Sequence, residues 1–434
     1  MKKIFQYIML AVVTIVMASC TSDIEETTAT TGKSNVQLVV GEFPAFGDSQ
    51  TRAIGTPDEG KTSWAEGDEL LLEMTSKTLG TKYAAFTYNG SSWELTSGEL
   101  SYKEDEVPTF PHVYYAPNYK WEAGKLVLKE GKAAGTDEYI EGKANITPNG
   151  QGINVSFTDA TRNYSRLRIA TMPNKQITVA INKYIPAGSS SMEWFQDIAL
   201  TSDEKGNAYL YGTFVRYFDF EVKYEGAPLA SHTFYQAAEN AKSYALDATV
   251  VSLADEGITY DQIVEDVKKE LDAGKTYINL MLAPDADEET LDAIHIGLAG
   301  ASYGTINLTL IGCKKIPSGG FMYWKMLKSI ALPDVTEIAE KAFLDCTRLQ
   351  KVVLGNLTKV YGKAGEKGIF EGCRTKDIDL VLSKDQKVMN GGETEGGYCW
   401  TADITKDYSG SDEHNGRVFL DYDFQSITCG YPVP

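Results

Sequence analysis

The chain has 434 residues, of which 43% are hydrophobic and 23% charged, a composition typical of globular proteins that bury substantial cores. This length predicts roughly two to four domains. Acidic residues outnumber basic ones by 60 to 41, and the formal net charge is −19. Nucleic acid and anionic lipid both require basic surfaces, so this balance argues against nucleic acid as a partner and against electrostatic docking on a membrane.

The first residues form a targeting segment. Two lysines open the chain, an apolar run extends from Ile8 to Met17, and small residues lead into Cys20. The run is too short to span a membrane comfortably and predicts a secretory signal. Its small-small-Cys ending resembles the lipobox of bacterial lipoproteins. The resemblance implies that residues 1–19 are removed and that Cys20 carries the lipid; the alternative is an ordinary signal peptide with an unrelated cysteine.

Residues 20–34 are polar, rich in Thr and partly acidic, with no apolar period. Such a segment predicts a flexible tether. Acidic residues just after the lipid-bearing cysteine resemble the surface-export signal of lipoproteins from Gram-negative anaerobes, although any solvated linker can be acidic. We therefore expect a surface-exposed lipoprotein of the outer membrane, held by several acyl chains where one would be marginal.

Short strand patterns fill the next two hundred residues. Val36–Val40 and Asp68–Met74 read as strands, and Tyr83–Leu95 reads as a hairpin that turns at Asn89-Gly90. Further strands are expected between Ile153 and Val250, after a turn-rich stretch near residues 142–152. The pattern predicts two β-sandwiches, residues 35–145 and 146–252.

Ordered motifs in this region suggest a family. They are Thr51-Arg52-Ala53, Ser63-Trp64, Trp93, Tyr114-Tyr115-Ala116-Pro117 and Tyr164-Ser-Arg166-Leu-Arg168-Ile169. They resemble fimbrillin-like proteins, which implies two tandem transthyretin-like β-sandwiches over about residues 35–250. Some members are fimbrial subunits that are cleaved after an Arg, so that a partner's strand fills the vacated groove. The matching position is Arg52; the alternative is that Arg52 is an ordinary surface residue.

Residues 253–434 begin with two helix patterns. Thr259-Tyr-Asp-Gln262 fits a capping box and Gly274 supplies a stop. A second amphipathic stretch runs from Asp287 to Ala299, where we expect His295 to pack between elements rather than to bind a ligand. Each helix precedes a strand, which predicts an α/β cap at the start of the domain.

The remainder of this region repeats. Leu310, Leu332 and Leu354 end short strands and lie 22 residues apart, and a fourth strand ends at Leu382. Phe321, Phe343 and Phe370 precede the last three strands. One strand per unit of this length predicts a leucine-rich-repeat solenoid, in which stacked units share one core. Lys328-Ser-Ile330-Ala-Leu332-Pro333 and Ala342-Phe343-Leu-Asp-Cys346 resemble BspA-like leucine-rich repeats over about residues 276–384. The resemblance implies a surface protein that binds host matrix or other cells.

The residues that alternate with the inward Leu and Ile should face outward and form two columns. The first column is Asn279, Asn307, Ser329, Lys351 and Asp379, and the second is Met281, Thr309, Ala331, Val353 and Val381. The second column is unusually apolar for an exposed face, which makes it a candidate contact surface. The alternative is that a cap, the Tyr361–Gly368 insert or the second sandwich covers it.

Six cysteines leave five after lipidation of Cys20. Cys346 and Cys373 hold the position of Trp324 in the repeat and are expected to fill the core. Cys399 and Cys429 flank the C-terminal cap and are a possible disulfide. No spacing fits a zinc site, and we expect no metal and no cofactor.

Enzyme motifs are missing, including GxSxG, the P-loop and HExxH, so we expect no enzymatic activity. The sequence favours a lipid-anchored adhesin with sandwiches as a stalk and the solenoid as a head that binds a host or bacterial surface protein. A first alternative is a glycan-binding lipoprotein for nutrient capture, motivated by 25 Tyr and 6 Trp. A second is a fimbrial tip or anchor subunit that assembles with other fimbrial subunits by strand exchange.

Overall fold

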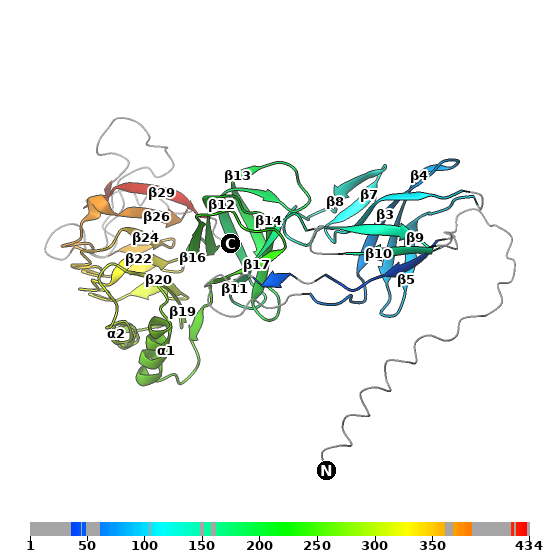
Figure 1. The fold of residues 1–434 in the computed structure, drawn as a ribbon. Coiled ribbons are helices and arrows are strands. Elements are labelled where there is room, and N and C mark those ends of the chain that lie inside the picture. The colour runs from blue at the N-terminus through cyan, green and yellow to red at the C-terminus, as the bar shows by residue number, and fades with distance from the viewer. Residues whose placement is uncertain are drawn as a thin grey trace, which may run out of the picture.

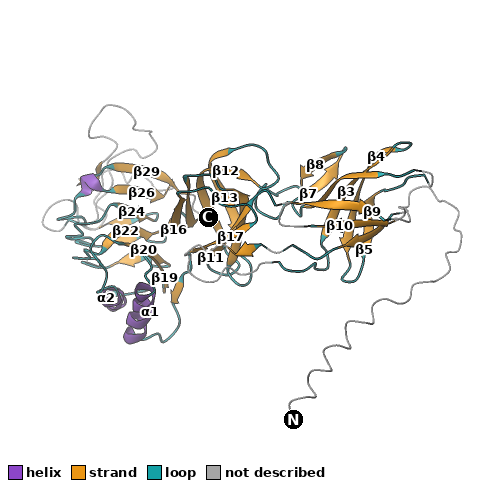
Figure 2. Ribbon diagram, viewed as in Figure 1, coloured by secondary structure: helices purple, strands orange, loops and turns teal. Residues whose placement is uncertain are grey.

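The computed structural model describes residues 36–44, 46–48, 61–103, 106–147, 152–157, 162–360, 368–383, 418–420 and 422–431. Strands predominate in these ranges, and the two α-helices lie at one end of the molecule (Figure 2). Three large sheets follow one another along an elongated molecule (Figure 1). The mainly β architecture with several sheets agrees with the sequence prediction.

None of the helices in these ranges is long and apolar enough to cross a membrane.

The first sheet contains seven strands. In spatial order they are β1 (Gln37–Val40), β10 (Gly152–Ser156), β9 (Ile140–Ile146), β6 (Thr109–Tyr115), β3 (Glu69–Ser76), β4 (Gly80–Tyr88) and β5 (Trp93–Gly98). Alternation along β3 buries Leu70, Leu72 and Met74 in the core on one face of the sheet. Leu71 points the other way, where the hairpin of β7 (Tyr119–Glu122) and β8 (Lys125–Leu128) covers it.

The second sheet is built around a core of phenylalanines. Its path is β16 (Ala227–Phe234), β15 (Phe218–Tyr224), β12 (Gln176–Pro186), β14 (Asn207–Thr213), β11 (Ser165–Ala170), β17 (Lys242–Asp247) and β2 (Gly47–Asp48), with β13 (Glu193–Thr201) on the other edge of β12. Phe214, Phe218 and Phe234 stack within 6 Å of one another in this core. Because β2 belongs to the N-terminal segment, that segment contributes strands to both the first and the second sheet.

The third sheet is parallel throughout. Its order is β18 (Val251–Leu253), β19 (Tyr277–Leu282), β20 (Ile306–Ile311), β22 (Leu327–Leu332), β24 (Lys351–Leu354), β26 (Asp379–Ser383) and β29 (Ser426–Tyr431). Smaller elements are a parallel sheet of β21 (Lys315–Ile316), β23 (Glu337–Ile338) and β25 (Lys359–Val360), a hairpin of β27 (Val418–Phe419) and β28 (Tyr422–Asp423), and a 3-10 helix, Thr375–Asp377.

Successive turns of this parallel stack have the same geometry. The rings of Phe321 and Phe343 stack at 5.3 Å, and those of Phe343 and Phe370 at 5.0 Å. The residue two positions after each Phe has a positive φ, 64° at Tyr323, 57° at Asp345 and 75° at Gly372. The turns therefore superpose residue for residue, and their side chains form one continuous core.

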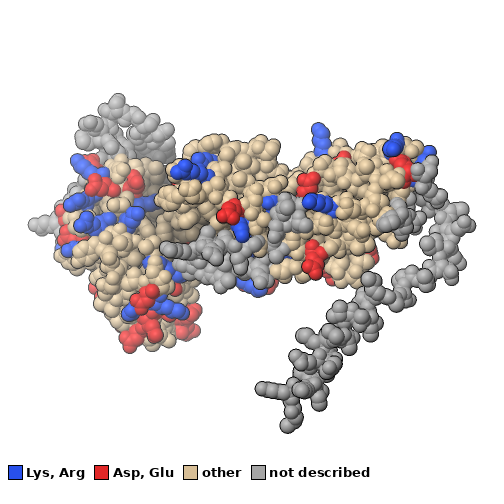
Figure 3. All heavy atoms as spheres, viewed as in Figure 1, with Lys and Arg blue, Asp and Glu red and all other residues tan. Residues whose placement is uncertain are grey.

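Two helices cover the start of the stack. Helix α1 (Tyr260–Asp272) begins with the predicted capping box at Thr259, and α2 (Glu288–Gly297) begins at the side chain of Asp287. His295 on α2 stacks on the ring of Trp324 at 4.7 Å, which confirms its packing role. Acidic side chains gather over the end of the molecule that holds the two helices (Figure 3).

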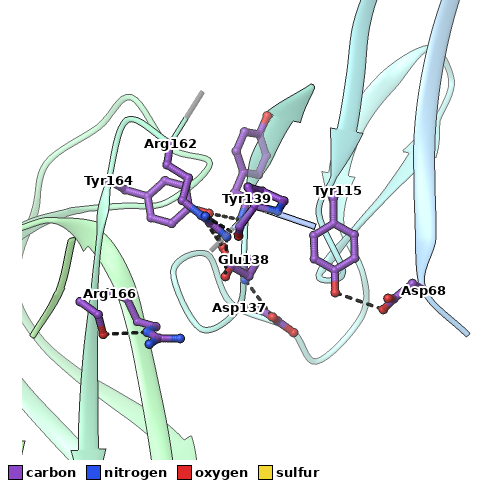
Figure 4. A network of polar contacts seen from close by, with 10 residues as sticks. Asp68, Tyr115, Asp137, Glu138, Tyr139, Arg162, Tyr164 and Arg166 are labelled. Atoms are coloured by element: carbon purple, nitrogen blue, oxygen red, sulfur yellow. Dashed lines mark hydrogen bonds and ion pairs between the residues drawn. The ribbon is translucent and has the colours of Figure 1, made fainter. Parts of the chain in front are cut away.

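Buried charges join the first and second sheets (Figure 4). Arg162 has no exposed side-chain surface, forms an ion pair with Glu138 at 3.3 Å and donates to the carbonyl of Pro44 at 2.8 Å. The Tyr164 hydroxyl donates to the same carboxylate. The ring of Phe46 lies 4.0 Å from the Arg162 guanidinium. Losing one partner of such a buried pair typically costs about 3–5 kcal/mol, so this junction is firmly held.

The predicted boundary at residues 145 and 146 is wrong. It falls between β9 and β10, which pair with each other, and both strands belong to the first sheet. Residues 142–146 of the turn-rich stretch belong to β9 and residue 152 begins β10, so the change of sheet comes between β10 and β11. The boundary at residues 252 and 253 falls inside β18, which already pairs with β19. The sequence reading also missed β7, β8, β13 and β16.

Candidate functional site

Several predicted sites lie outside the described residues. These are Cys20 with the signal peptide and tether, Arg52, Cys399, and the side chain of Cys429, whose backbone is part of β29. Within the described ranges, no group of three or more His, Cys, Asp or Glu side chains could hold a metal ion.

The two predicted columns exist on the parallel sheet, with one change of register. Asn307, Ser329, Lys351 and Asp379 are aligned neighbours, and so are Thr309, Ala331, Val353 and Val381. Asn279, however, pairs with Thr309 instead of Asn307, and Met281 pairs with Ile311. Strand β19 is thus shifted by two residues from the prediction. A shift of two keeps every side chain on the same face, so alternation alone could not reveal it.

The expectation that the second column is a free contact surface is wrong. Thr309, Ala331 and Val353 are each 1% exposed. Ala331 and Val353 form a small core with Ala227 of β16, and Val381 packs against it. Met281 and Ile311 join the core of the second sheet. The apolar face is therefore covered by the second sheet, as the alternative reading allowed, and Figure 1 shows β16 against this face.

Polar side chains of the parallel sheet donate hydrogen bonds to two backbone carbonyls of β16. The Thr309 hydroxyl donates to the Pro228 carbonyl at 2.7 Å, and the Asn279 amide donates to the Leu229 carbonyl at 2.9 Å. Asn279 is 3% exposed. The two side chains satisfy these carbonyls, because buried carbonyls need a donor. The second and third sheets are therefore joined by specific, buried hydrogen bonds as well as by apolar packing.

The first column borders this interface. Ser329 is mostly buried and donates to Asn307 at 2.7 Å, and Lys351 forms an ion pair with Glu221 of β15 at 3.2 Å. Asp379 accepts a hydrogen bond from Ser426 on β29. These residues bind the chain's own neighbouring strands. They do not form an open polar surface for a partner.

A cavity of about 670 Å³ opens beside the interface, between β16, β17 and the turn that leads into β19. The Ser231 and Tyr277 hydroxyl oxygens lie 2.7 Å apart and connect the interface to this cavity. The cavity is lined by Leu167, Phe220, Ala230, Ser231, His232, Thr233, Phe234, Tyr235, Gln236, Ala237, Glu239, Tyr244, Ala245, Leu246, Asp247, Gly274, Lys275, Thr276 and Tyr277. This volume is in the range of small-molecule sites, which are apolar clefts with a few polar groups.

Aromatic rings form much of the cavity wall. Phe234 packs edge-on against Tyr244 at 5.1 Å and against His232 at the same distance. Tyr235 is 70% exposed at the rim. Burial lowers the pKa of His232, so its imidazole is neutral at pH 7. His232 lines the cavity, and a neutral imidazole offers one hydrogen-bond donor and one acceptor.

A lysine with two carboxylates fixes one end of the cavity. The Lys275 ammonium lies 2.8 Å from Asp247 of β17 and 2.5 Å from Glu270 of α1. Burial opposes ionisation of Asp247, but hydrogen bonds from Lys275 and Thr249 outweigh it and lower its pKa. The trio carries one net negative charge and ties the helical cap to the second sheet. The two carboxylates outweigh the positive charge of Lys275, so this lysine is unsuited to bind a free anion.

The cavity also lies where two strands lack lateral partners. Strand β17 pairs with β11 along one edge. On its other edge it pairs with β2 only at Lys242 and Ser243, so the described residues place no strand on that edge beside Tyr244–Asp247. Strand β16 pairs with β15 alone, and the third sheet covers only its first half. Two open edges thus border the cavity.

Sequence reasoning missed this site. His232 lies on a strand, Tyr235 in a loop, Lys275 in the connection after α1 and Tyr277 on a second strand, and no local motif connects them. The available signal was the exposed pair Ser231-His232 after the apolar run Ala227–Ala230, since that break in pattern marks where β16 leaves the interface.

Comparisons with known proteins add little. The chain matches no protein-family model and no curated protein sequence. Among solved structures it matches a Bacteroides fragilis protein described as a candidate cell adhesion protein, with 10% sequence identity and a TM-score of 0.27. The match covers 50% of this chain and 93% of that one. At this identity and score it assigns no function.

Proposed function

We propose that the protein is a lipid-anchored surface lipoprotein that binds glycans in the cavity between its second and third sheets. The observation that supports this proposal most directly is the cavity of about 670 Å³, which is lined by aromatic rings, a neutral imidazole and polar side chains. Sugars present apolar C–H faces that pack on aromatic rings and hydroxyls that need both donors and acceptors. The glycan alternative thereby gains support over a head that binds proteins through its strand face.

The anchoring part of the proposal rests on the sequence. The short apolar run before Cys20 and the acidic tether after it support lipidation and display on the outer membrane. We further propose that the first two sheets are fimbrillin-like sandwiches of the transthyretin type and that the parallel stack is a BspA-like leucine-rich repeat. The 22-residue register of Asn307, Ser329 and Lys351 supports the repeat assignment.

The binding proposal is tested with the chain from residue 21 onward on a glycan array, followed by calorimetry on the glycan it captures. We expect Tyr235→Ala to weaken binding about tenfold, since a stacked ring contributes on the order of 1.4 kcal/mol. Tyr303→Ala is the matched control: Tyr303 is 68% exposed, close to the 70% of Tyr235, but does not line the cavity. Equal binding by Tyr235→Ala and wild type would contradict the proposed site.

Surface display has its own test. Protease applied to intact cells should degrade the wild-type protein, and a Cys20→Ala variant should fail to reach the membrane fraction. A wild-type protein that is protected in intact cells but degraded after lysis would contradict display.

A second candidate function is assembly by strand exchange, which the open edges of β16 and β17 favour. An extended peptide can add to such edges through main-chain hydrogen bonds. Hydrogen exchange separates the two candidates. A fimbrial subunit's strand should protect the amides of both Ser231–Phe234 and Tyr244–Asp247, whereas a sugar bound to side chains should leave most of these amides exchanging as before.

A further inference from the structure

Two cysteines occupy the same position in adjacent turns of the parallel stack. Cys346 and Cys373 each follow by three residues a phenylalanine of the ring stack, and those two rings, Phe343 and Phe370, lie 5.0 Å apart with planes inclined by 8°. Next to the cysteines, the Asp345 amide donates to the Glu371 carbonyl at 2.8 Å. The two turns therefore run side by side at ordinary strand spacing, within the Cα separation of roughly 4.4–6.8 Å that a disulfide spans.

Cys346 and Cys373 are both free cysteines in this structure. Cys346 is fully buried, and the neighbouring Cys373 thiol together with burial raises the pKa of its thiol. Each sulfur also lies near the carbonyl of the phenylalanine one turn back, at 3.0 Å for Cys346 and 2.9 Å for Cys373. Cys373 is half-buried, so it is the more accessible of the two. In the turn before them, Trp324 fills the equivalent position.

We propose that Cys346 and Cys373 are a disulfide-forming pair that covalently links two successive turns of the stack. The link closes a loop that contains residues 361–367, where the repeat is longest. The sequence had suggested only core filling for these residues and a possible bridge between Cys399 and Cys429. In the cell the reaction rests on the proposed export, since disulfides persist in oxidising compartments.

Formation of the Cys346–Cys373 bond needs an oxidant, and the test uses glutathione disulfide for this purpose. The accessible Cys373 thiolate attacks one glutathione sulfur, forms a mixed disulfide and releases one glutathione thiolate. The Cys346 thiolate then attacks the Cys373 sulfur and releases the second glutathione. Two protein thiols are oxidised by two electrons, one glutathione disulfide is reduced to two glutathiones, and the two thiol protons go to the released thiolates.

The test incubates the folded chain from residue 21 onward in a glutathione redox buffer at pH 8. The sample is quenched in acid, unfolded, alkylated without reductant and mapped by mass spectrometry. We expect one peptide pair joined through Cys346 and Cys373, lighter by two hydrogens than the sum of the free peptides, and absent after reduction. Cys313 is the internal control, because it is buried and, among the described residues, bonds only to the Lys315 carbonyl; it should be alkylated throughout.

Alkylation of both Cys346 and Cys373 after oxidation would overturn the proposal, and so would a link from either one to Cys399 or Cys429. A Cys373→Ala variant should leave Cys346 alkylated, and it should lose the rise in melting temperature that oxidation gives the wild type. A second arm maps protein from cells lysed into alkylating agent. A link that forms in the buffer but not in cells would contradict the proposed export and leave the geometric inference standing.

Discussion

The hydroxyl of Thr309 donates a hydrogen bond of 2.7 Å to the backbone carbonyl of Pro228, 81 residues earlier in the chain. Both residues are buried where the parallel sheet meets β16. Replacing the hydroxyl with a methyl group in Thr309→Val keeps the shape and leaves the carbonyl without its donor. We expect a loss of about 1–2 kcal/mol in the free energy of unfolding, measured in urea. The control is Thr358→Val, which removes an exposed hydrogen bond to the Thr336 carbonyl in the same stack and should cost little.

A charge at the centre of the covered face should destabilise the fold. Val353 is 1% exposed and contacts Ala227 and Ala331, so Val353→Asp buries a carboxylate without a partner. We expect a loss of about 3 kcal/mol or more, visible as a clear drop in melting temperature. If the second column faced solvent, the same variant would keep the melting temperature of the wild type. Val107→Asp, at a position 71% exposed, is the matched control and should melt like the wild type.

Removing Lys275 should loosen the helical cap from the second sheet. Lys275→Met leaves Asp247 and Glu270 facing each other in a site where the lysine is 12% exposed, and we expect a cost of about 3 kcal/mol at pH 7. The folded state lowers the pKa of Asp247, so its contribution is present above the ordinary value of 3.8 and is lost as pH falls through the folded value. The gap between wild type and variant should therefore narrow in urea titrations at progressively lower acid pH. A gap that widens in acid would refute this account.

The pKa of Asp137 is shifted in the opposite direction to that of Asp247, so its effect on stability has the opposite dependence on pH. Burial and the neighbouring Glu138 raise its pKa above 3.8, although the Glu138 amide donates to it at 2.8 Å. A raised carboxyl pKa means that the folded state binds the proton more tightly, so this group lowers stability as pH rises from 3.8 through the folded pKa. Asp137→Asn keeps the acceptor and removes the charge. We expect a higher melting temperature than wild type at pH 7 and no difference below pH 3.8, measured by calorimetry at both values.

Tyr323 has a φ of 64° and is 51% exposed, whereas the equivalent residues Asp345 and Gly372 suit that left-handed conformation better. Tyr323→Asn should relieve strain and stabilise the protein by roughly 0.5–1 kcal/mol in urea. The reciprocal change, Asp345→Tyr, should destabilise by a similar amount. Equal stability of all three proteins would show that this turn carries no strain.

Local signals predicted most of the architecture. The Asn89-Gly90 hairpin, the Thr259 capping box and the strands near Val36–Val40 and Asp68–Met74 all lie where the residues indicated, since each depends on neighbours within a few positions. The interface did not follow from such signals. The apolar side chains of Ala331 and Val353 indicate that another surface covers them. That surface is β16, a strand about a hundred residues earlier in the chain that was not predicted from the sequence. The cavity is harder still, because it exists only once two sheets have been docked.

Strand β2 adds a mechanical consequence to the topology. Consider a force that pulls on the chain before residue 36 and is resisted at the cavity beside the third sheet. This force enters the protein at β1, which pairs in parallel with β10 over four residues. It next reaches β2, which is paired in parallel with β17 at the cavity wall. Force along parallel neighbours shears all their hydrogen bonds at once instead of opening them one by one. The load path therefore crosses from the first sheet to the second and ends at the cavity wall. If the chain is anchored and binds a ligand as proposed, tension would act on the wall of the binding site.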